Sequence, residues 1–212
     1  LTAILGYSEL LTGTDENDPL KLKRYSLTIH DNVLRLIEIV DDLLLLSKIE
    51  TGEFLQKTTF SIQDLFNELE ELYKQKLVQK KIQWLTSLEN SSMTLYADKF
   101  RIRQMLINLV DNAIKFSHEE GSIHLRAKKE KKGILLTIQD NGIGIPFIDQ
   151  ERIFERFYQV DKARSSHSEG TGLGLSIVKH IVEQHQGNVS VESHLGKGSI
   201  FSIYLPQSIE ET

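Results

Sequence analysis

The first fifty residues carry apolar side chains at helical spacing, in two segments at about 1–12 and 20–50 that a polar stretch separates. In the second segment the apolar positions advance in alternating steps of four and three residues, which is the spacing of a coiled-coil seam. These seam positions are Ile29, Val33, Leu36, Val40 and Leu43. Ile37 and Leu44 widen the apolar stripe to the width that a four-helix bundle requires. The pattern predicts an antiparallel helical hairpin.

Two helices supply only half of a four-helix bundle, so we expect the hairpin to pair with that of a second copy, as a homodimer. On periodicity alone, the alternative is a helix that packs on its own globular domain. The stop signal Thr51-Gly-Glu marks a domain boundary, with a helical hairpin at 1–52 and a second domain at 53–212.

From residue 53 the pattern changes to short alternating segments mixed with longer periodic ones. Ser61 and Asp98 are placed to cap the starts of two helices. The charged stretch 128–132 predicts a turn between two antiparallel strands. Several helices with a mostly antiparallel sheet predict a two-layer α+β domain and not a doubly wound parallel sheet. The expected strands are about 54–60, 82–85, 93–96, 122–127, 133–139, 188–192 and 199–205, and the expected helices are 61–79, 98–117 and 173–186.

Composition narrows the choice of partners. The chain has 212 residues, 40% of them hydrophobic, which is enough for a sizeable core. Its 25 basic and 30 acidic residues give a net charge of −5 without a basic stripe, so nucleic acid is a poor candidate partner. Without cysteine there is no disulfide and no thiolate metal site, and the apolar runs are too short to predict direct membrane contact. The chain begins at Leu1 within a helical pattern, so we expect a fragment of a longer protein.

Two glycine-rich loops carry the candidate chemistry. The later loop, residues 170–175, opens directly into an amphipathic helical segment. Glycines permit close approach of the backbone to a ligand, and the unpaired amides at a helix start hold phosphate well. The earlier loop, residues 140–146, offers the carboxylate of Asp140 where an apolar strand ends. We expect one end of a nucleotide to be recognised at Asp140 and the other to be held by the later loop.

The helix expected at 98–117 carries Asn108, Asn112 and Lys115 at steps of four and three, which places all three on one face. Amide oxygens suit a hydrated Mg²⁺, and an amine neutralises phosphate oxygens. The alternative is an ordinary solvated face. The polar segment 159–169 has little to bury and suits a mobile flap, or an ordinary surface loop.

Together, these motifs resemble those of the bacterial sensor histidine kinases of two-component systems, over nearly the whole chain. The resemblance implies a two-layer α/β sandwich of the Bergerat (GHKL) type, preceded by an antiparallel helical hairpin that forms a dimeric four-helix bundle. The hairpin is similar to the family's dimerisation domain, with residues 1–11 as the end of its first helix. The matching stretches are 101–115 (asparagine box), 140–146 (first glycine box), 153–157 (phenylalanine box), 170–174 (second glycine box) and 196–201 (closing motif).

The resemblance also implies roles. Asn112 would bind Mg²⁺ held between the phosphates of ATP, with Asn108 nearby, and Lys115 would contact phosphate. Asp140 would accept a hydrogen bond from the adenine amino group. The γ-phosphoryl group would pass to a histidine and then to an aspartate on a response-regulator receiver domain, a transfer that depends on positioning and charge neutralisation. The protein would act in the cytoplasm, as part of a longer protein anchored in the inner or plasma membrane of a bacterium.

The remaining residues expected to contact the nucleotide lie in the two glycine boxes and beside the phenylalanine box. They are Gly142, Gly144, Ile145, Tyr158, Gly170, Thr171, Gly172, Leu173, Gly174 and Leu175.

Two departures from the family pattern affect the expected chemistry. The family's phosphoacceptor histidine precedes the segment that begins here at Leu1, so this chain should bind ATP without phosphorylating itself at the family site. Gln159 stands at a lid position where many relatives carry Arg. Arg156 or Arg164 could replace that charge, so both join Asn108 and Lys115 as candidate catalytic residues.

Three other functions compete. Chaperone, topoisomerase and mismatch-repair ATPases of this fold carry a Glu four residues before the metal-binding Asn, where this chain has Asn108, a poor general base. Serine kinases of the fold are disfavoured by the helical hairpin. A degenerate nucleotide-binding scaffold is disfavoured by the intact Asn112, Asp140 and glycines.

Overall fold

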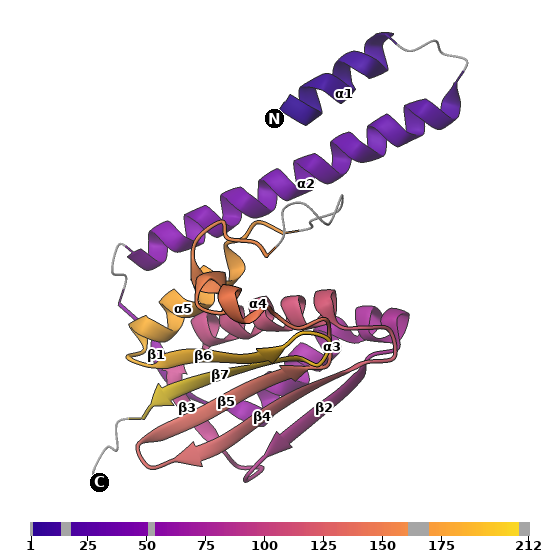
Figure 1. Cartoon of the computed structure of the whole chain (residues 1–212). Helices are drawn as coiled ribbons and strands as arrows, with labels where there is room; N and C mark the ends of the chain where they lie inside the picture. The colour runs from indigo at the N-terminus through magenta and orange to yellow at the C-terminus, as the bar shows by residue number, and fades with distance from the viewer. Residues whose placement is uncertain (1, 14–17, 51–53, 161–169, 208–212) are drawn as a thin grey trace.

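The computed structural model describes residues 2–13, 18–50, 54–160 and 170–207 (Figure 1). The order of elements matches the predicted sequence of helices and strands, with two short 3₁₀ turns in addition. The elements are α1 (Thr2–Gly13), α2 (Pro19–Glu50), β1 (Lys57–Ser61), α3 (Ile62–Lys80), β2 (Gln83–Leu88), β3 (Thr94–Asp98), α4 (Lys99–Phe116), β4 (Ser122–Glu130), β5 (Gly133–Asp140), η1 (Phe147–Asp149), η2 (Arg152–Phe154), α5 (Gly174–Gln184), β6 (Asn188–His194) and β7 (Gly198–Pro206).

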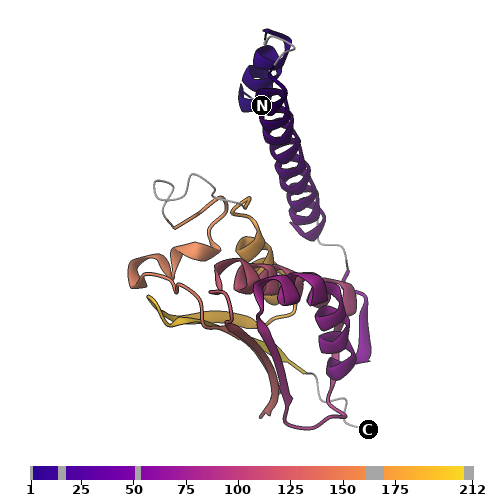
Figure 2. The same ribbon diagram turned by 90° about the vertical axis from the view of Figure 1, so that its right-hand side faces the viewer.

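Helices α1 and α2 form the predicted hairpin, and the aromatic rings of Tyr7 and Tyr25 pack across it at 5.6 Å between centroids. Figure 2 shows the hairpin projecting from the α/β body. The apolar stripe of α2 stays largely exposed; Ile37, for example, has 51% of its surface accessible. None of the described helices has both the length and the apolar content that crossing a bilayer requires.

The body is a five-stranded sheet with helices α3, α4 and α5 on one face, as Figures 1 and 2 show. The strand order is β2-β4-β5-β7-β6, and only β2 pairs in parallel, with β4, among these described strands. Strands β1 and β3 form a separate antiparallel pair. Alternate side chains of the sheet point to the helices, and they form the core with the buried faces of α3, α4 and α5. The predicted two-layer α+β architecture is confirmed.

Both predicted helix caps are present. Ser61 Oγ accepts a hydrogen bond from the backbone N–H of Asp64 (3.1 Å) at the start of α3, and Asp98 Oδ1 accepts one from Arg101 (3.1 Å) at the start of α4. Such caps satisfy amide donors that the helix itself leaves unpaired.

Three predicted strand boundaries were wrong by three residues, and one of them is the end of β2, which lies at Leu88 and not at 85. Strand β1 begins at Lys57 and not at 54, because Phe54 is 97% exposed and has no sheet neighbour to pack against. Strand β4 continues to Glu130, which pairs with Gly133, so the charged turn shrinks to Lys131 and Lys132. Charged side chains are compatible with a strand end there because that part of β4 is largely exposed.

Asp98 joins four parts of the body. Its Oδ2 accepts a hydrogen bond from the backbone N–H of Gln56 (2.9 Å), just before β1. Its own N–H donates to Nε2 of His185 (3.2 Å), at the end of α5. Nδ1 of His185 in turn donates to the carbonyl of Ile181 (2.8 Å), and burial lowers the pKa of this histidine. The imidazole is therefore held in one neutral tautomer between α4 and α5.

Candidate functional site

The three polar residues predicted on one face of α4 are half-buried. Asn108 Nδ2 donates a hydrogen bond to the carbonyl of Gly174 (3.1 Å), the first residue of α5. A Cβ at Gly170 would lie 3.1 Å from Nζ of Lys115. Asn112 lies between the other two along the helix, and its amide has no hydrogen-bond partner among the described residues. The structure thus brings this face of α4 to the second glycine loop.

The second glycine loop packs closely on the phenylalanine box. Gly172 has φ +74°, and its carbonyl accepts a hydrogen bond from Phe157 N–H (2.8 Å). A Cβ at Gly172 would lie 2.8 Å from Cα of Phe157, so this position requires glycine. The hydroxyl of Thr171 accepts a hydrogen bond from the backbone N–H of Leu173 (3.1 Å), which is buried, and Leu175 is half-buried in the first turn of α5.

The first glycine loop holds a nearly buried carboxylate. Asp140 is 6% exposed, and its Oδ1 accepts a hydrogen bond from the backbone N–H of Gly142 (2.8 Å). Burial raises the pKa of Asp140, and the hydrogen bond from Gly142 partly opposes that shift. A Cβ at Gly142 would lie 2.1 Å from the carbonyl oxygen of Phe116, at the end of α4. Gly144, with φ +72°, continues the loop. The close approach of the two backbones fixes the carboxylate beside the asparagine-box helix.

Two residues that sequence reasoning missed support this loop. Ser193 Oγ accepts a hydrogen bond from the backbone N–H of Ile145 (2.7 Å). Gln150 Nε2 donates to the carbonyl oxygens of Ile145 (3.1 Å) and Ser193 (2.8 Å). The pattern offered one signal: Val189 and Val191 alternate inward with Ser193, and a polar residue at an inward strand position needs a hydrogen-bond partner.

The segment around the lid is only partly described. Tyr158 donates its hydroxyl hydrogen to Asp149 Oδ1, and the guanidinium of Arg152 lies 4.3 Å from its ring centroid, so this side chain lies against the two 3₁₀ turns. Arg156 is exposed. Arg164 and most of the predicted flap lie outside the described residues.

Helix α2 also touches the second glycine loop, which the sequence did not indicate. Arg35 Nη2 and Gln159 Nε2 both donate to the carbonyl oxygen of Gly170, at 3.1 and 2.8 Å. The hydroxyl of Thr171 donates to Oδ2 of Asp42 (2.8 Å). The loop is therefore held from the hairpin as well as from the body.

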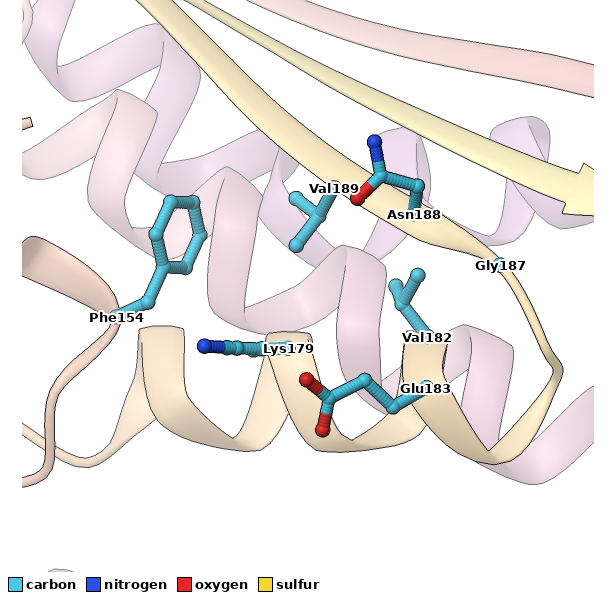
Figure 3. A pocket seen from close by; sticks show the side chains of 7 residues that line it. All are labelled: Phe154, Lys179, Val182, Glu183, Gly187, Asn188 and Val189. Atoms are coloured by element: carbon cyan, nitrogen blue, oxygen red, sulfur yellow. The ribbon is translucent and has the colours of Figure 1, made fainter. Parts of the chain in front are cut away.

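A cavity of about 200 Å³ opens elsewhere, between α5 and β6 (Figure 3). None of the residues predicted to contact the nucleotide lines it. Its lining consists of Phe154, Lys179, Val182, Glu183, Gly187, Asn188 and Val189.

Comparison with known proteins gives a consistent result. Residues 97–209 match the family model described as histidine kinase-, DNA gyrase B- and HSP90-like ATPase, and residues 1–52 match that of the His kinase A (phospho-acceptor) domain. The circadian input-output histidine kinase CikA of Synechococcus elongatus is 36% identical over 211 residues, covering 98% of this chain and 28% of that protein.

Solved structures resemble the chain over almost its full length. The histidine kinase AdeS of Acinetobacter baumannii gives a TM-score of 0.77 at 27% identity, over 98% of this chain and 94% of that one. The histidine kinase ThkA, solved in complex with the response regulator protein TrrA, gives a TM-score of 0.78 at 28% identity, over 100% of this chain and 58% of that one.

This chain spans less than half the length of the curated relatives it matches, 28% of CikA and 46% of the sensor histidine kinase RppB of Synechocystis, for example. The two family models match residues 1–52 and 97–209 of this chain, and the fold agrees with that of solved histidine kinases. The chain belongs to the sensor histidine kinases of two-component systems.

Proposed function

We propose that this chain is the catalytic portion of a sensor histidine kinase, which binds Mg²⁺-ATP and transfers the γ-phosphoryl group to a histidine on a longer form of the protein. The observation that carries this proposal is the meeting of Asn108 and Lys115, on the face of α4 that also carries Asn112, with the second glycine loop. That arrangement puts amide groups and an ammonium beside the unpaired N–H groups at the start of α5, which suits phosphate.

Adenine would bind at the other end, against Asp140. Its carboxylate is nearly buried and is fixed by Gly142 N–H, so its hydrogen-bond acceptors have a set direction. An exocyclic amino group of the base is the matching donor. A purine with a carbonyl at that position would present an acceptor to an acceptor, and the site would reject it.

Mg²⁺ fits the donor set at the phosphate end. The amide of Asn112 is half-buried without a hydrogen-bond partner among the described residues, and amide oxygen is a ligand that Mg²⁺ accepts while keeping several waters. Asn112 would hold the ion together with the phosphates. When bound, Mg²⁺ neutralises charge on the phosphate oxygens.

For the phosphoryl transfer itself, the chain must position the reacting groups and neutralise negative charge. The bond between the γ-phosphorus and its bridging oxygen breaks while a bond to a histidine ring nitrogen forms, ADP leaves with the electron pair, and the ring proton is released. Lys115 would balance negative charge during this step. Asn108 donates to Gly174 and accepts from Gln104 Nε2 (3.4 Å), so it is a structural amide and cannot take a proton from water as a hydrolase base would.

A homodimer is part of the proposal. The stripe on α2 exposes 38% to 51% of Leu36, Ile37 and Val40. Contiguous exposed apolar surface on a helix marks an interaction face, and a second hairpin would complete a four-helix bundle. The complex of ThkA with a response regulator supports a receiver domain as the phosphoryl acceptor in the next step. We place the kinase on the cytoplasmic side of a bacterial membrane.

The test uses γ-labelled ATP. This chain is mixed with a longer version that contains the upstream helix and carries Asn112→Ala, so the longer partner can accept a phosphoryl group without binding nucleotide. Acid-labile label on the longer partner, and none on this chain alone, is the expected result.

If the longer partner stays unlabelled, two explanations are possible, and labelling of the intact longer chain alone distinguishes them. If the intact longer chain labels itself, transfer occurs within one chain and the kinase assignment stands. If the intact longer chain also stays unlabelled while mixed dimers and ATP binding are confirmed, the kinase proposal fails and a nucleotide-binding scaffold remains.

A further inference from the structure

Helix α2 contacts the second glycine loop at two points. Arg35 donates to the carbonyl of Gly170, and Asp42 accepts from the hydroxyl of Thr171. The two helix residues are seven positions apart, about two turns, so they lie on one face of α2. Figure 1 shows α2 passing across the start of α5, where this loop ends. One helix face therefore holds two consecutive residues of the loop.

Arg35 retains hydrogen-bonding capacity at this position. A guanidinium carries five N–H donors, and the structure engages one Nη2 donor with Gly170. The remaining donors have no partner among the described residues. Gln159 donates to the same carbonyl oxygen but is neutral, so of these two donors only Arg35 brings positive charge to the loop.

A second cation approaches the same glycine from α4. Nζ of Lys115 would lie 3.1 Å from a Cβ at Gly170, so an ammonium and a guanidinium from two different elements meet at one residue. Positive charge from two elements at one residue favours the binding of an anion there. The start of α5, with its unpaired amides, follows directly.

The contact at Asp42 fixes the register of α2 on the loop. Its carboxylate is half-buried and accepts a hydrogen bond from the Thr171 hydroxyl, whose oxygen in turn accepts one from Leu173 N–H. This directed chain of hydrogen bonds runs from α2 into the start of α5. A slide of α2 by one residue would break it, so the chain holds Arg35 beside Gly170.

We propose that Arg35 is a further phosphate-binding residue of the site and contacts the terminal phosphate of the nucleotide bound by the same chain. The inference rests on the proposed ATP-binding function. Arginine suits this task because its planar fork donates two parallel hydrogen bonds to phosphate oxygens. The helical hairpin then contributes directly to nucleotide binding, in addition to forming the dimer.

The experiment compares nucleotides that differ only in their phosphates. Calorimetric titration of the 212-residue chain with Mg²⁺-ATP, Mg²⁺-ADP and adenosine is repeated with Arg35→Gln. Loss of a charge-assisted hydrogen bond should weaken ATP roughly tenfold, leave adenosine unchanged and affect ADP much less. Arg35→Lys keeps the charge without the fork and should restore part of the ATP affinity.

The matched control is Arg24→Gln. Arg24 is an exposed arginine on nearly the same face of α2, 11 residues earlier, about 16 Å away along the axis. The Arg24→Gln variant should bind ATP, ADP and adenosine with the affinities of the parent chain. A change in the ratio of ATP to ADP affinity in Arg35→Gln alone identifies a contact to the terminal phosphate, because a purely structural role would weaken both nucleotides equally.

Two results would overturn the proposal. One is an equal loss of ATP and ADP affinity, and the other is identical behaviour of Arg35→Gln and Arg24→Gln. If Asp140→Asn nevertheless weakens ATP in the same titration, the proposed nucleotide site stands and only the role of Arg35 is lost. A parent chain that binds no Mg²⁺-ATP would remove both.

Discussion

Asn108 Nδ2 lies 3.1 Å from the carbonyl oxygen of Gly174, and this hydrogen bond joins the asparagine-box helix α4 to the first residue of α5. The bond crosses 66 positions of sequence and closes the phosphate end of the proposed site. It also explains how an asparagine serves here in place of a carboxylate, since only the amide can donate to a carbonyl.

Replacing Asn108 by Asp should therefore weaken nucleotide binding. The carboxylate would face the carbonyl of Gly174 as a second acceptor, so we expect at least about a tenfold loss of Mg²⁺-ATP affinity in a titration. Asn67→Asp is the control, because Asn67 accepts a hydrogen bond from Gln63 Nε2 (2.9 Å) and aspartate keeps that role. Unchanged affinity in Asn108→Asp would mean that the bond does not shape the site.

Asn112→Ala should abolish Mg²⁺-dependent ATP binding and leave the dimer intact. The side chain makes no hydrogen bond among the described residues, so its removal costs little stability. Titration with and without Mg²⁺ measures the first effect, and light scattering the second. Asp111→Asn is the control. Asp111 is the neighbouring residue on α4, and its exposed side chain pairs with Lys76, so this variant should bind Mg²⁺-ATP as the parent chain does. Wild-type affinity in Asn112→Ala would refute the metal assignment.

Asp140→Asn should weaken ATP and reduce the preference for ATP over GTP. Burial raises the pKa of Asp140, so protonation begins at a higher pH than for an ordinary aspartate. The carboxylate accepts from the adenine amino group more strongly than the neutral acid does, so ATP affinity should fall as the pH is lowered through that raised pKa. Titrations over a pH series measure this fall. A parent chain that binds ATP and GTP equally would contradict the adenine role.

Gly142→Ala should destabilise the body by about 2 kcal/mol or more, a typical cost of forced overpacking. The new Cβ would lie 2.1 Å from the carbonyl oxygen of Phe116, where backbone must move. Gly6→Ala is the matched substitution in helix α1, where nothing lies within 4 Å. It should stabilise the helix by about 0.5–1 kcal/mol. Urea unfolding of both variants measures the contrast, and equal stabilities would show that the loop relaxes freely.

Stability should rise with pH in the region governed by His185. Burial lowers the folded-state pKa of this histidine below the unfolded value of 6.5. The unfolded chain therefore binds more protons between the two pKa values. The contribution of His185 to the free energy of unfolding is fully present above pH 6.5 and is lost as the pH drops towards the folded-state pKa. Urea unfolding at about pH 5.5 and 7.5 should show this slope flattened in His185→Asn and kept in His30→Asn, an exposed histidine. An equal slope in both variants would assign the pH dependence to other groups.

Much of the fold followed from local patterns. Ser61 and Asp98 were predicted as caps because a capping residue acts within three positions of its own sequence. The alternation of β5 likewise reports which side chains face the helices. The end of β4 was missed because Lys128 and Lys129 resemble a turn in sequence, while in the sheet their neighbours on β5 supply the pairing. Such pairing is a non-local property.

The candidate site divides in the same way. Asn108, Asn112 and Lys115 were found because helical spacing alone places them on one face. Arg35 and Asp42 were missed because a seven-residue step on a helix looks the same whether it faces a second hairpin or a loop 129 to 135 residues away. Nothing in the local pattern tells these two cases apart.

The hydrogen bond between Gln56 and Asp98 limits how far the α/β body can move from the end of α2. From the end of α2 at Glu50 to Gln56 there are six residue steps, which span at most about 20 Å when fully extended. As long as the Gln56–Asp98 bond holds, Asp98 stays about this distance or less from the end of α2, and the body can reposition a bound nucleotide only by swinging about that attachment. An acceptor histidine must therefore lie within the range through which the body can swing on this short linker, whichever chain carries the histidine.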